Sequence, residues 1–366
     1  MAALLALLAC VPSANAASFF GSGATWNTPL PLKPKLDSTS SRIVSSLSLW
    51  MKTKALEGEY PGIATDRYST PVYTADASTA RQPVVIDPGT PAQGDLIQAI
   101  DAVGGVPFPA NAKPAAGTDG HITVYDPGAD ALYELWRASS PSMNATNCVT
   151  PLPWGVPCHR DGQWHAEWGG MMDHVSSSPG FFSVDSWPGL TGTEGYDWGA
   201  TATSLPLLAG LITFGDLSSG TIDHALAGSF VGLKTCRTFF MFPAQRDDGL
   251  SVMPDCLPEG ARLQLDPAYD VRTDRNPPLT KAIERAAQTY GIVIRDKTAD
   301  TFSFYGQDPS PLSTNPYTSG PGVGGVDNGG LGWFGGVAPS QLFRHFPWSR
   351  LRVIAGTRCS AAPCGP

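Results

Sequence analysis

Glycine and proline interrupt this chain so often that most of its segments can form only short elements of secondary structure. Its 366 residues include 40 glycines and 34 prolines, a content below that of disordered chains. Because 42% of the residues are hydrophobic, the chain can still bury a core. The pattern predicts a mostly β protein, a single domain of jelly-roll or β-sandwich type with a few peripheral α-helices.

A hairpin is the clearest strand signal. The runs His121–Tyr125 and Leu132–Trp136 alternate in polarity and are separated by turn-forming residues at 126–130, so we expect them to pair antiparallel. Short apolar runs bounded by turn residues predict the other strands, at 71–75, 82–88, 221–231, 235–242, 261–265, 292–295 and 301–305.

Helical spacing of apolar residues appears in a few segments only. Residues 41–56 and 278–290 have this spacing, and 93–105 has it up to the stop signal at Gly104. The tail at 339–356 predicts a short helix that runs into a terminal strand. We therefore expect the helices to surround a β core.

The N-terminus resembles a secretion signal. An apolar run is followed by Ala14-Asn15-Ala16, a small-residue cleavage pattern. We expect residues 1–16 to be a signal peptide and residues 17–366 to form one secreted β-sandwich-like domain. A lipid anchor through Cys10 is the alternative. No later run is long and apolar enough to span a membrane.

Cysteine usage agrees with an extracellular location. Without Cys10, six cysteines remain in three sequence-local pairs, and disulfides are typical of exported proteins. Six cysteines allow 15 connectivities, so the pairing is predicted from proximity alone. The expected disulfides are Cys148–Cys158, Cys236–Cys256 and Cys359–Cys364.

Charge and motifs exclude several classes of function. Lysine and arginine total 24 against 32 acidic residues, a net charge of −8, and no basic cluster is present, so nucleic acid is not an expected partner. The glycine-rich stretch at 318–336 lacks the residues of a phosphate loop. We expect a monomer without a cofactor, unless a structural calcium ion is bound by the abundant acids.

A third alternating run, at 162–170, concentrates aromatic and ionisable residues. In one extended strand, Trp164, Ala166 and Trp168 would lie on one face. His165 and Glu167 would lie on the other. Aromatic rings that stack on sugars, next to carboxyl groups that donate and accept protons, are typical of glycoside hydrolases. The run therefore predicts a secreted enzyme that cleaves extracellular polysaccharide.

Two carboxyl groups are needed for that reaction. We assign Glu134 and Glu167 as the acid/base pair, with Asp173 and His165 assisting and His224 near the cleft. The expected substrate-binding residues are Trp136, Trp164, Trp168, Trp198 and Arg246.

Structural roles are the alternative for each of these residues. The tryptophans would then fill a core, and Glu167 would be a solvated strand residue. Glu134 lies between apolar neighbours, so it is either paired with an arginine such as Arg137 or raised in pKa. His224 follows an acid in an apolar run and would then donate to a buried carbonyl.

Other functions remain open from the residues alone. A polysaccharide lyase would use histidine and tyrosine for proton transfer and an arginine to neutralise a uronate. A metal site would form if Asp119 and His121 met His165 and Glu167 from a neighbouring strand. A non-catalytic carbohydrate-binding or cell-surface protein would keep a flat aromatic face.

Four motifs in fixed order carry a resemblance. They are WHAEWGGMMDHVSSSPG, DWGATATSLPLLAGLI, GTIDHALAG and FPAQRDDG. Together they are similar to a group of exported bacterial proteins, common in actinobacteria, for which no activity is established. The resemblance spans residues 26–354 and implies secretion and one continuous domain. It implies no catalytic residue.

Overall fold

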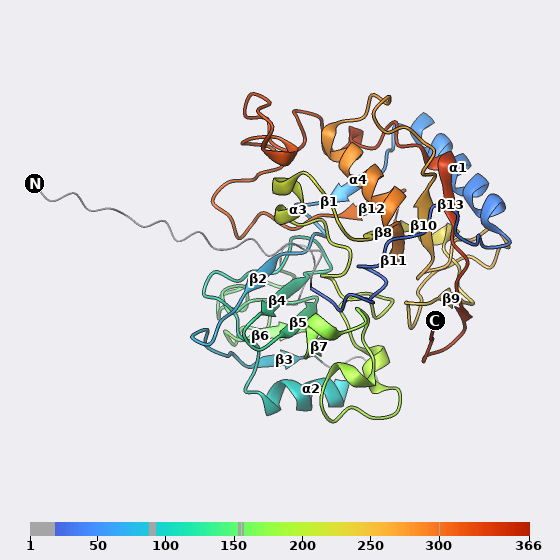
Figure 1. Ribbon diagram of the computed structural model, residues 1–366. Coiled ribbons are helices and arrows are strands. Elements are labelled where there is room, and N and C mark those ends of the chain that lie inside the picture. The colour runs from blue at the N-terminus through green and yellow to red at the C-terminus, as the bar shows by residue number, and fades with distance from the viewer. Residues whose placement is uncertain (1–18, 88–92, 153–154, 156, 300) are drawn as a thin grey trace, which may run out of the picture.

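Strands in two larger and two smaller sheets dominate the described part of the chain (Figure 1). This computed structural model describes residues 19–366, except 88–92, 153–154, 156 and 300. The expected mainly β architecture is confirmed. The expected signal peptide, with Cys10, lies outside the described residues.

The larger sheet has six strands of mixed direction. β1 pairs with β12 in parallel and β8 pairs with β11 in parallel, while the other neighbours are antiparallel. The strands in spatial order are β1 (Gly62–Ala64), β12 (Phe302–Tyr305), β8 (Leu226–Val231), β11 (Ile292–Thr298), β10 (Arg262–Leu265) and β13 (Leu351–Val353).

The second sheet has four strands and contains the predicted hairpin. β4 and β5 pair antiparallel with Thr123 opposite Glu134, which confirms the hairpin. β2 joins β4 in parallel and β7 joins β5 antiparallel. In spatial order the strands are β2 (Val72–Thr74), β4 (Ile122–Asp126), β5 (Ala131–Trp136) and β7 (Trp168–Met172).

Two short sheets complete the strand pairing. β3 (Val84–Ile86) pairs in parallel with β6 (Trp164–Ala166). β9 (Phe240–Met241) pairs with β14 (Arg358–Cys359), so the predicted strand at 235–242 is limited to two residues. The helix α2 (Gln93–Ala102) contacts β3 and β7.

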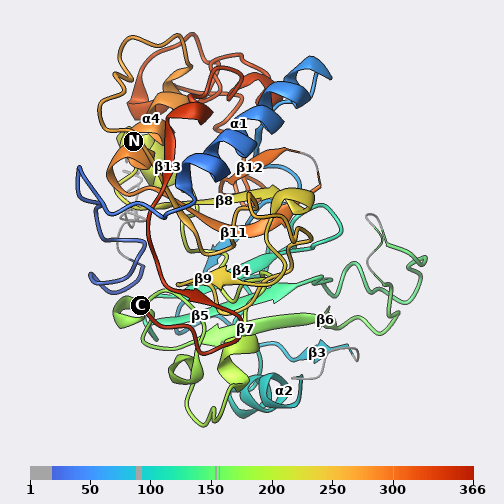
Figure 2. The same cartoon turned by 90° about the vertical axis from the view of Figure 1, so that its right-hand side faces the viewer.

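The two larger sheets lie one above the other, with helices on the outside (Figures 1 and 2). One hydrophobic cluster joins the four-stranded sheet to Ala227, Val293 and Tyr305 of the six-stranded sheet. A second cluster lies between the opposite face of the six-stranded sheet and the helices α1 (Ser40–Leu56) and α4 (Pro278–Thr289). The space between the sheets is therefore partly a core and partly, as described below, a cavity.

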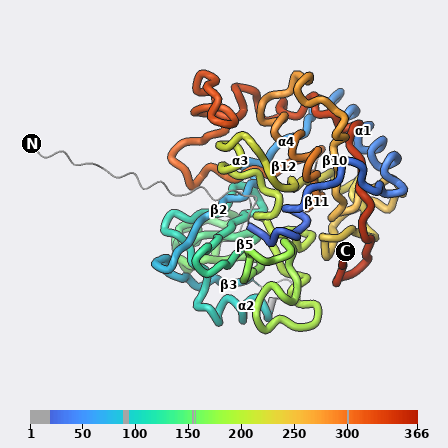
Figure 3. Tube along the Cα trace, viewed as in Figure 1, coloured from blue at the N-terminus to red at the C-terminus, as the bar shows by residue number. Residues whose placement is uncertain are grey.

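The middle of the chain builds one half of this arrangement, and both ends build the other (Figure 3). After β1 the chain forms the four-stranded sheet and the β3–β6 pair, and then returns to the six-stranded sheet with β8, β10, β11, β12 and β13. The jelly-roll connectivity is not confirmed, because four strand pairs are parallel whereas jelly rolls are antiparallel.

Both long helices follow their apolar periodicity. In α1, Ile43, Leu47 and Met51 are four residues apart and buried, which places them on one helical face. α4 has proline at its first position, where the missing N–H costs no hydrogen bond. None of the described helices combines the length and apolar character needed to cross a membrane.

The predicted strand at 162–170 is divided in the structure. β6 ends at Ala166 and pairs with β3, whereas β7 begins at Trp168 and pairs with β5. Opposite the break, Arg137 has a left-handed backbone with φ of 51°, which ends β5. His165 and Glu167 therefore do not share one face of a continuous strand, and this expectation was wrong.

All three predicted disulfides are present. Cys148 is bonded to Cys158, Cys236 to Cys256 and Cys359 to Cys364. The bonds are consistent with an extracellular protein, since disulfides persist in oxidising compartments.

The longest of these disulfide loops is expected to contribute most to stability. Replacing Cys236 and Cys256, which are 20 residues apart, with serine should lower the free energy of unfolding by about 3 kcal/mol, because the unfolded chain gains loop entropy. Replacing Cys359 and Cys364, which are 5 residues apart, is the matched control and should cost less. Urea unfolding of both double variants measures the difference, and an equal loss in both would contradict the loop-entropy explanation.

Candidate active site

A cavity of about 1000 Å³ lies between the two larger sheets. Its walls come from β1, β8, β11 and β12 on one side and from the ends of β5 and β7 on the other. The exposed residues Asp66, Arg67 and Tyr68 line its edge, so the cavity opens to solvent there. Its volume is that of a typical small-molecule site.

Two tryptophans form an aromatic wall of the cavity. Trp136 ends β5 and Trp168 begins β7, and the two residues are direct neighbours across the strand pair. The indole N–H of Trp168 donates to the carbonyl of Asp197 at 3.0 Å, which holds this ring in place. Trp136 and Trp168, two of the residues expected to bind substrate, therefore line the same cavity.

Arg246, a third expected substrate-binding residue, also lines the cavity. Its guanidinium donates to the carbonyls of Gly199 and Thr201 at 3.3 and 2.8 Å. Gly199 has φ of +107°, and a Cβ there would lie 2.7 Å from the ring of Phe182. Only glycine fits this position of the WGAT motif, and its backbone conformation places the two carbonyls within reach of Arg246.

Three carboxyl groups meet at one side of the cavity. One oxygen each of Asp248, Glu259 and Asp296 lies within 4.8 Å of the others. Asp248 and Asp296 line the cavity, whereas Glu259 is buried behind them. Lys297 forms an ion pair with Asp248, and the backbone N–H of Asp248 donates to Glu259 at 2.9 Å. We call these three residues the carboxylate cluster.

Burial and mutual repulsion favour protons in this cluster. Burial, together with the charge of Asp248, raises the pKa of Asp296 to about 7. The same two causes raise the pKa of Glu259 well above its ordinary value. Ionising all three neighbouring carboxyl groups is unfavourable, because their negative charges repel one another. The cluster can therefore supply a protonated acid beside an ionised carboxylate at neutral pH.

A β-bulge in β11 brings Asp296 to the cavity. The register of β11 against β8 shifts between Ile294 and Asp296, and such bulges redirect side chains. Arg295, the extra residue, places its guanidinium 4.0 Å from the ring centroid of Tyr305. Arg295 and Asp296, although adjacent in the strand, therefore both face the space between the two larger sheets.

Glu134 lies behind the cavity wall and does not line it. It is fully buried, and one carboxyl oxygen accepts from the backbone N–H of Leu208 at 3.1 Å. Arg295 donates to the carbonyls of Leu207 and Ala209 in the same segment. Burial raises the pKa of Glu134 to about 7, although backbone hydrogen bonds from Leu207 and Leu208 and the charge of Arg295 act to lower it. Glu134 therefore holds the SLPLLAG segment in place.

Glu167 is not in the cavity wall either. Its carboxylate lies 2.6 Å from Nε of Arg137. Arg137 therefore pairs with Glu167, and the alternative in which Arg137 pairs with Glu134 was wrong. The structure does not bring the two predicted catalytic acids together in the cavity.

The other predicted catalytic residues occupy separate places. Asp173 contacts the exposed His174 at 3.2 Å. His224 is buried with one ring nitrogen 2.9 Å from the carbonyl of Ala225 and the other 3.2 Å from Asp216. Burial alone would lower the pKa of His224, but Asp216 raises it above its ordinary value. Its contacts are those of the structural role considered as the alternative.

Trp164 and Trp198 belong to the core and not to the cavity wall. Trp164 stacks on Phe108 at 3.9 Å between ring centroids. Trp198 is fully buried and donates to Asp95 at 2.8 Å. Their indole N–H groups are satisfied inside the protein, as buried tryptophans require.

His121 provides a neutral base in the cavity. Burial lowers its pKa to about 4, although the neighbouring Asp119 opposes this shift. Its Nδ1 is buried and has no hydrogen-bond partner among the described residues. Asp119 and His121 line the cavity, but His165 and Glu167 do not, so the four residues of the alternative metal site do not meet there.

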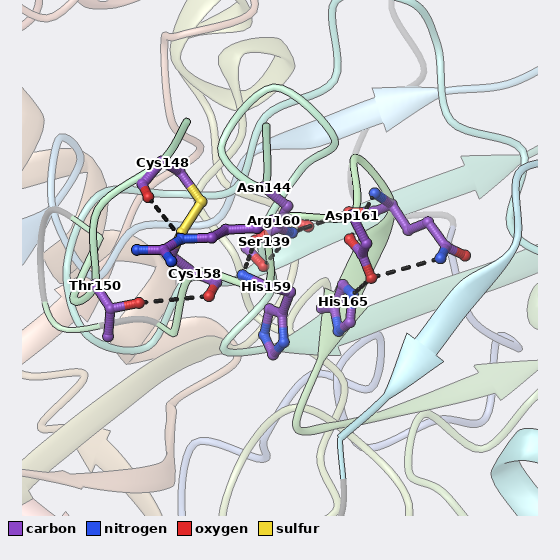
Figure 4. The surroundings of a disulfide bond; sticks show 10 residues. Ser139, Asn144, Cys148, Thr150, Cys158, His159, Arg160, Asp161 and His165 are labelled. Carbon is purple, nitrogen blue, oxygen red and sulfur yellow. Dashed lines mark hydrogen bonds and ion pairs between the residues drawn. A yellow bond between two sulfur atoms is a disulfide. The ribbon is translucent and has the colours of Figure 1, made fainter. Parts of the chain in front are cut away.

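His165, in β6, belongs to a second polar cluster, beside the loop that the Cys148–Cys158 disulfide closes (Figure 4). Its Nδ1 lies 2.8 Å from Asp87 and its Nε2 lies 2.8 Å from Asp161. The ring of His159 stacks on that of His165 at 3.6 Å. In the described part of the chain, this histidine cluster and the carboxylate cluster are the two groups with the spacing of metal ligands.

Sequence reasoning missed the carboxylate cluster. Its members come from three separate segments, and no local spacing relates them. Two signals were available. Asp248 belongs to the FPAQRDDG motif. Asp296 lies in an Arg-Asp-Lys run that continues the buried apolar residues 292–294 within the same strand, where charges are costly without a function.

The chain matches no family model, no curated protein and no solved structure. The fold and the cavity define a mainly β protein with a carboxyl-rich, tryptophan-lined site. The function must therefore be inferred from this site.

Proposed function

We propose that the protein is a secreted, monomeric glycoside hydrolase that cleaves an extracellular polysaccharide in the inter-sheet cavity. The observation that carries this proposal is the carboxylate cluster, which shares one solvent-open cavity with Trp136 and Trp168. Tryptophan faces bind sugar rings, and hydrolysis needs a paired acid and carboxylate. The proposal requires two facing sheets and does not depend on jelly-roll connectivity.

Within the cluster, the roles follow from the surroundings of each group. Asp296 is the general acid, because its raised pKa keeps a proton available near neutral pH. Asp248, in its ion pair with Lys297, is the carboxylate that attacks the anomeric carbon. Glu259 does not line the cavity and acts as a positioning residue through its hydrogen bond to the Asp248 backbone.

The spacing of the carboxyl groups favours one stereochemical outcome. Retaining enzymes place the two groups about 5–5.5 Å apart, whereas inverting enzymes need about 6.5–9.5 Å to admit a water molecule. Carboxyl oxygens within 4.8 Å are closer to the retaining spacing. Asp296 would then protonate the leaving oxygen while Asp248 forms a glycosyl ester, which water hydrolyses.

Elimination by a lyase is the second candidate function. It is favoured by the neutral His121, which could accept the sugar C5 proton, and by Arg246, which could neutralise a uronate. The acidic lining of the cavity, which includes Asp66, Asp119 and Asp248, argues against it, because acidic groups repel an anionic substrate. We therefore expect a neutral or weakly charged polysaccharide.

Incubation of the purified protein with a panel of neutral and uronate-containing polysaccharides tests this proposal. We expect new reducing ends from a neutral polymer, no absorbance of unsaturated uronates, and a first product that keeps the anomeric configuration by NMR. Unsaturated products would support elimination instead. Binding without cleavage across the panel would support a non-catalytic carbohydrate-binding protein.

A further inference from the structure

We propose that His159, His165 and Asp87 bind a divalent transition-metal ion of the Zn²⁺ type, with Asp161 orienting His165. Oxygen or nitrogen atoms of the first three residues lie within 4.8 Å of one another. Imidazole nitrogens with a carboxylate are typical ligands of zinc. None of these residues lines the inter-sheet cavity, so this site is separate from the proposed active site.

The hydrogen-bonding capacity of His165 points to a cation. Both of its ring nitrogens face carboxylate oxygens at 2.8 Å, but a neutral imidazole has only one N–H to donate. If Nε2 donates to Asp161, the lone pair of Nδ1 faces an oxygen of Asp87. A metal ion bound between Nδ1 and Asp87 removes this conflict. It also produces the carboxylate–histidine–metal arrangement common in metalloproteins.

His159 supplies an independent observation. Its Nε2 is buried and lies 3.1 Å from Asp87, yet it forms no hydrogen bond with any described residue. Ligands around tetrahedral zinc are about 3.3 Å apart, so the 2.8 and 3.1 Å contacts to Asp87 need only small changes. The two stacked rings must tilt apart for both lone pairs to meet one ion. Because His159 lies in a loop, we expect its ring to move.

The surrounding structure holds these ligands in place. His165 is tied to Ser139 by backbone hydrogen bonds in both directions. The buried Asn144 accepts from the N–H of His159 and donates to the carbonyl of Gln163. The Cys148–Cys158 disulfide closes the loop one residue before His159 (Figure 4). Ligands supported in this way give defined metal geometry.

Titration of the untagged, disulfide-bonded chain with Zn²⁺ by calorimetry tests the site. We expect one ion per chain. His159→Gln should lower the affinity at least 100-fold through loss of a ligand, and Asp161→Asn should lower it about 10–100-fold through loss of orientation. Co²⁺ should show a tetrahedral visible spectrum in the wild type that His159→Gln abolishes.

His174→Gln is the matched control, because His174 also contacts an aspartate but is exposed and has no second histidine beside it. It should bind Zn²⁺ as the wild type does. Circular dichroism of each metal-free variant shows whether it is folded. Unchanged affinity in a folded His159→Gln variant, or wild-type binding that never saturates at one ion, would overturn the proposal.

Discussion

Replacement of Asp296 with asparagine is expected to lower kcat on the cleaved polysaccharide by about 10²–10⁴-fold, the usual contribution of a general acid. Asparagine keeps the shape of the side chain but cannot donate the proton that the leaving oxygen needs. The wild-type rate should also fall as the pH rises above about 7, because Asp296 then loses its proton. The variant should lack this pH dependence.

Glu167→Gln is the matched control for this result. Glu167 was the acid expected from the sequence, but it pairs with Arg137 and does not line the cavity. We expect its variant to keep nearly wild-type kcat and KM. A large loss of activity in Glu167→Gln, with a normal rate in Asp296→Asn, would instead support catalysis by the predicted strand at 162–170.

Glu134→Gln is expected to change the pH dependence of stability. Burial raises the pKa of Glu134 from 4.5 to about 7. At about 1.4 kcal/mol per pH unit, this corresponds to about 3 kcal/mol. Between these two pKa values the folded state holds a proton that the unfolded state has released, so this group destabilises the fold as the pH rises. Relative to wild type, the variant should gain about 3 kcal/mol between pH 4 and pH 8.

Urea unfolding of both proteins at several pH values measures this difference. The comparison with wild type removes the contributions of other shifted groups, such as His224 and Glu284, which both proteins share. A constant difference between Glu134→Gln and wild type would show that Glu134 is not buried as a neutral acid.

Local signals predicted much of the fold. The β4–β5 hairpin, the helices α1 and α4 and the three disulfides follow from alternation, helical periodicity and proximity. Each of these features depends on residues close together in the chain. The mixed sheets did not follow, because parallel pairs such as β8 and β11 join segments far apart in sequence.

The candidate site was predicted in part. Trp136, Trp168 and Arg246 do line the cavity, but Trp164 does not. It shares an alternation pattern with Trp168, yet β6 pairs with β3 in a separate small sheet, whereas β7 belongs to the four-stranded sheet. A period of two shows which side chains of one strand share a face. It does not show where that strand ends or which sheet receives it.

By itself, the sequence determined a β-rich chain with three local disulfides and an aromatic, acidic character. These properties depend on residue type and short spacing. Only the tertiary structure decided which acids meet, because Asp248, Glu259 and Asp296 come together through a bulge in β11 and the packing of two sheets. The raised pKa values of Glu259 and Asp296 exist only there, since burial and mutual repulsion arise from proximity in space.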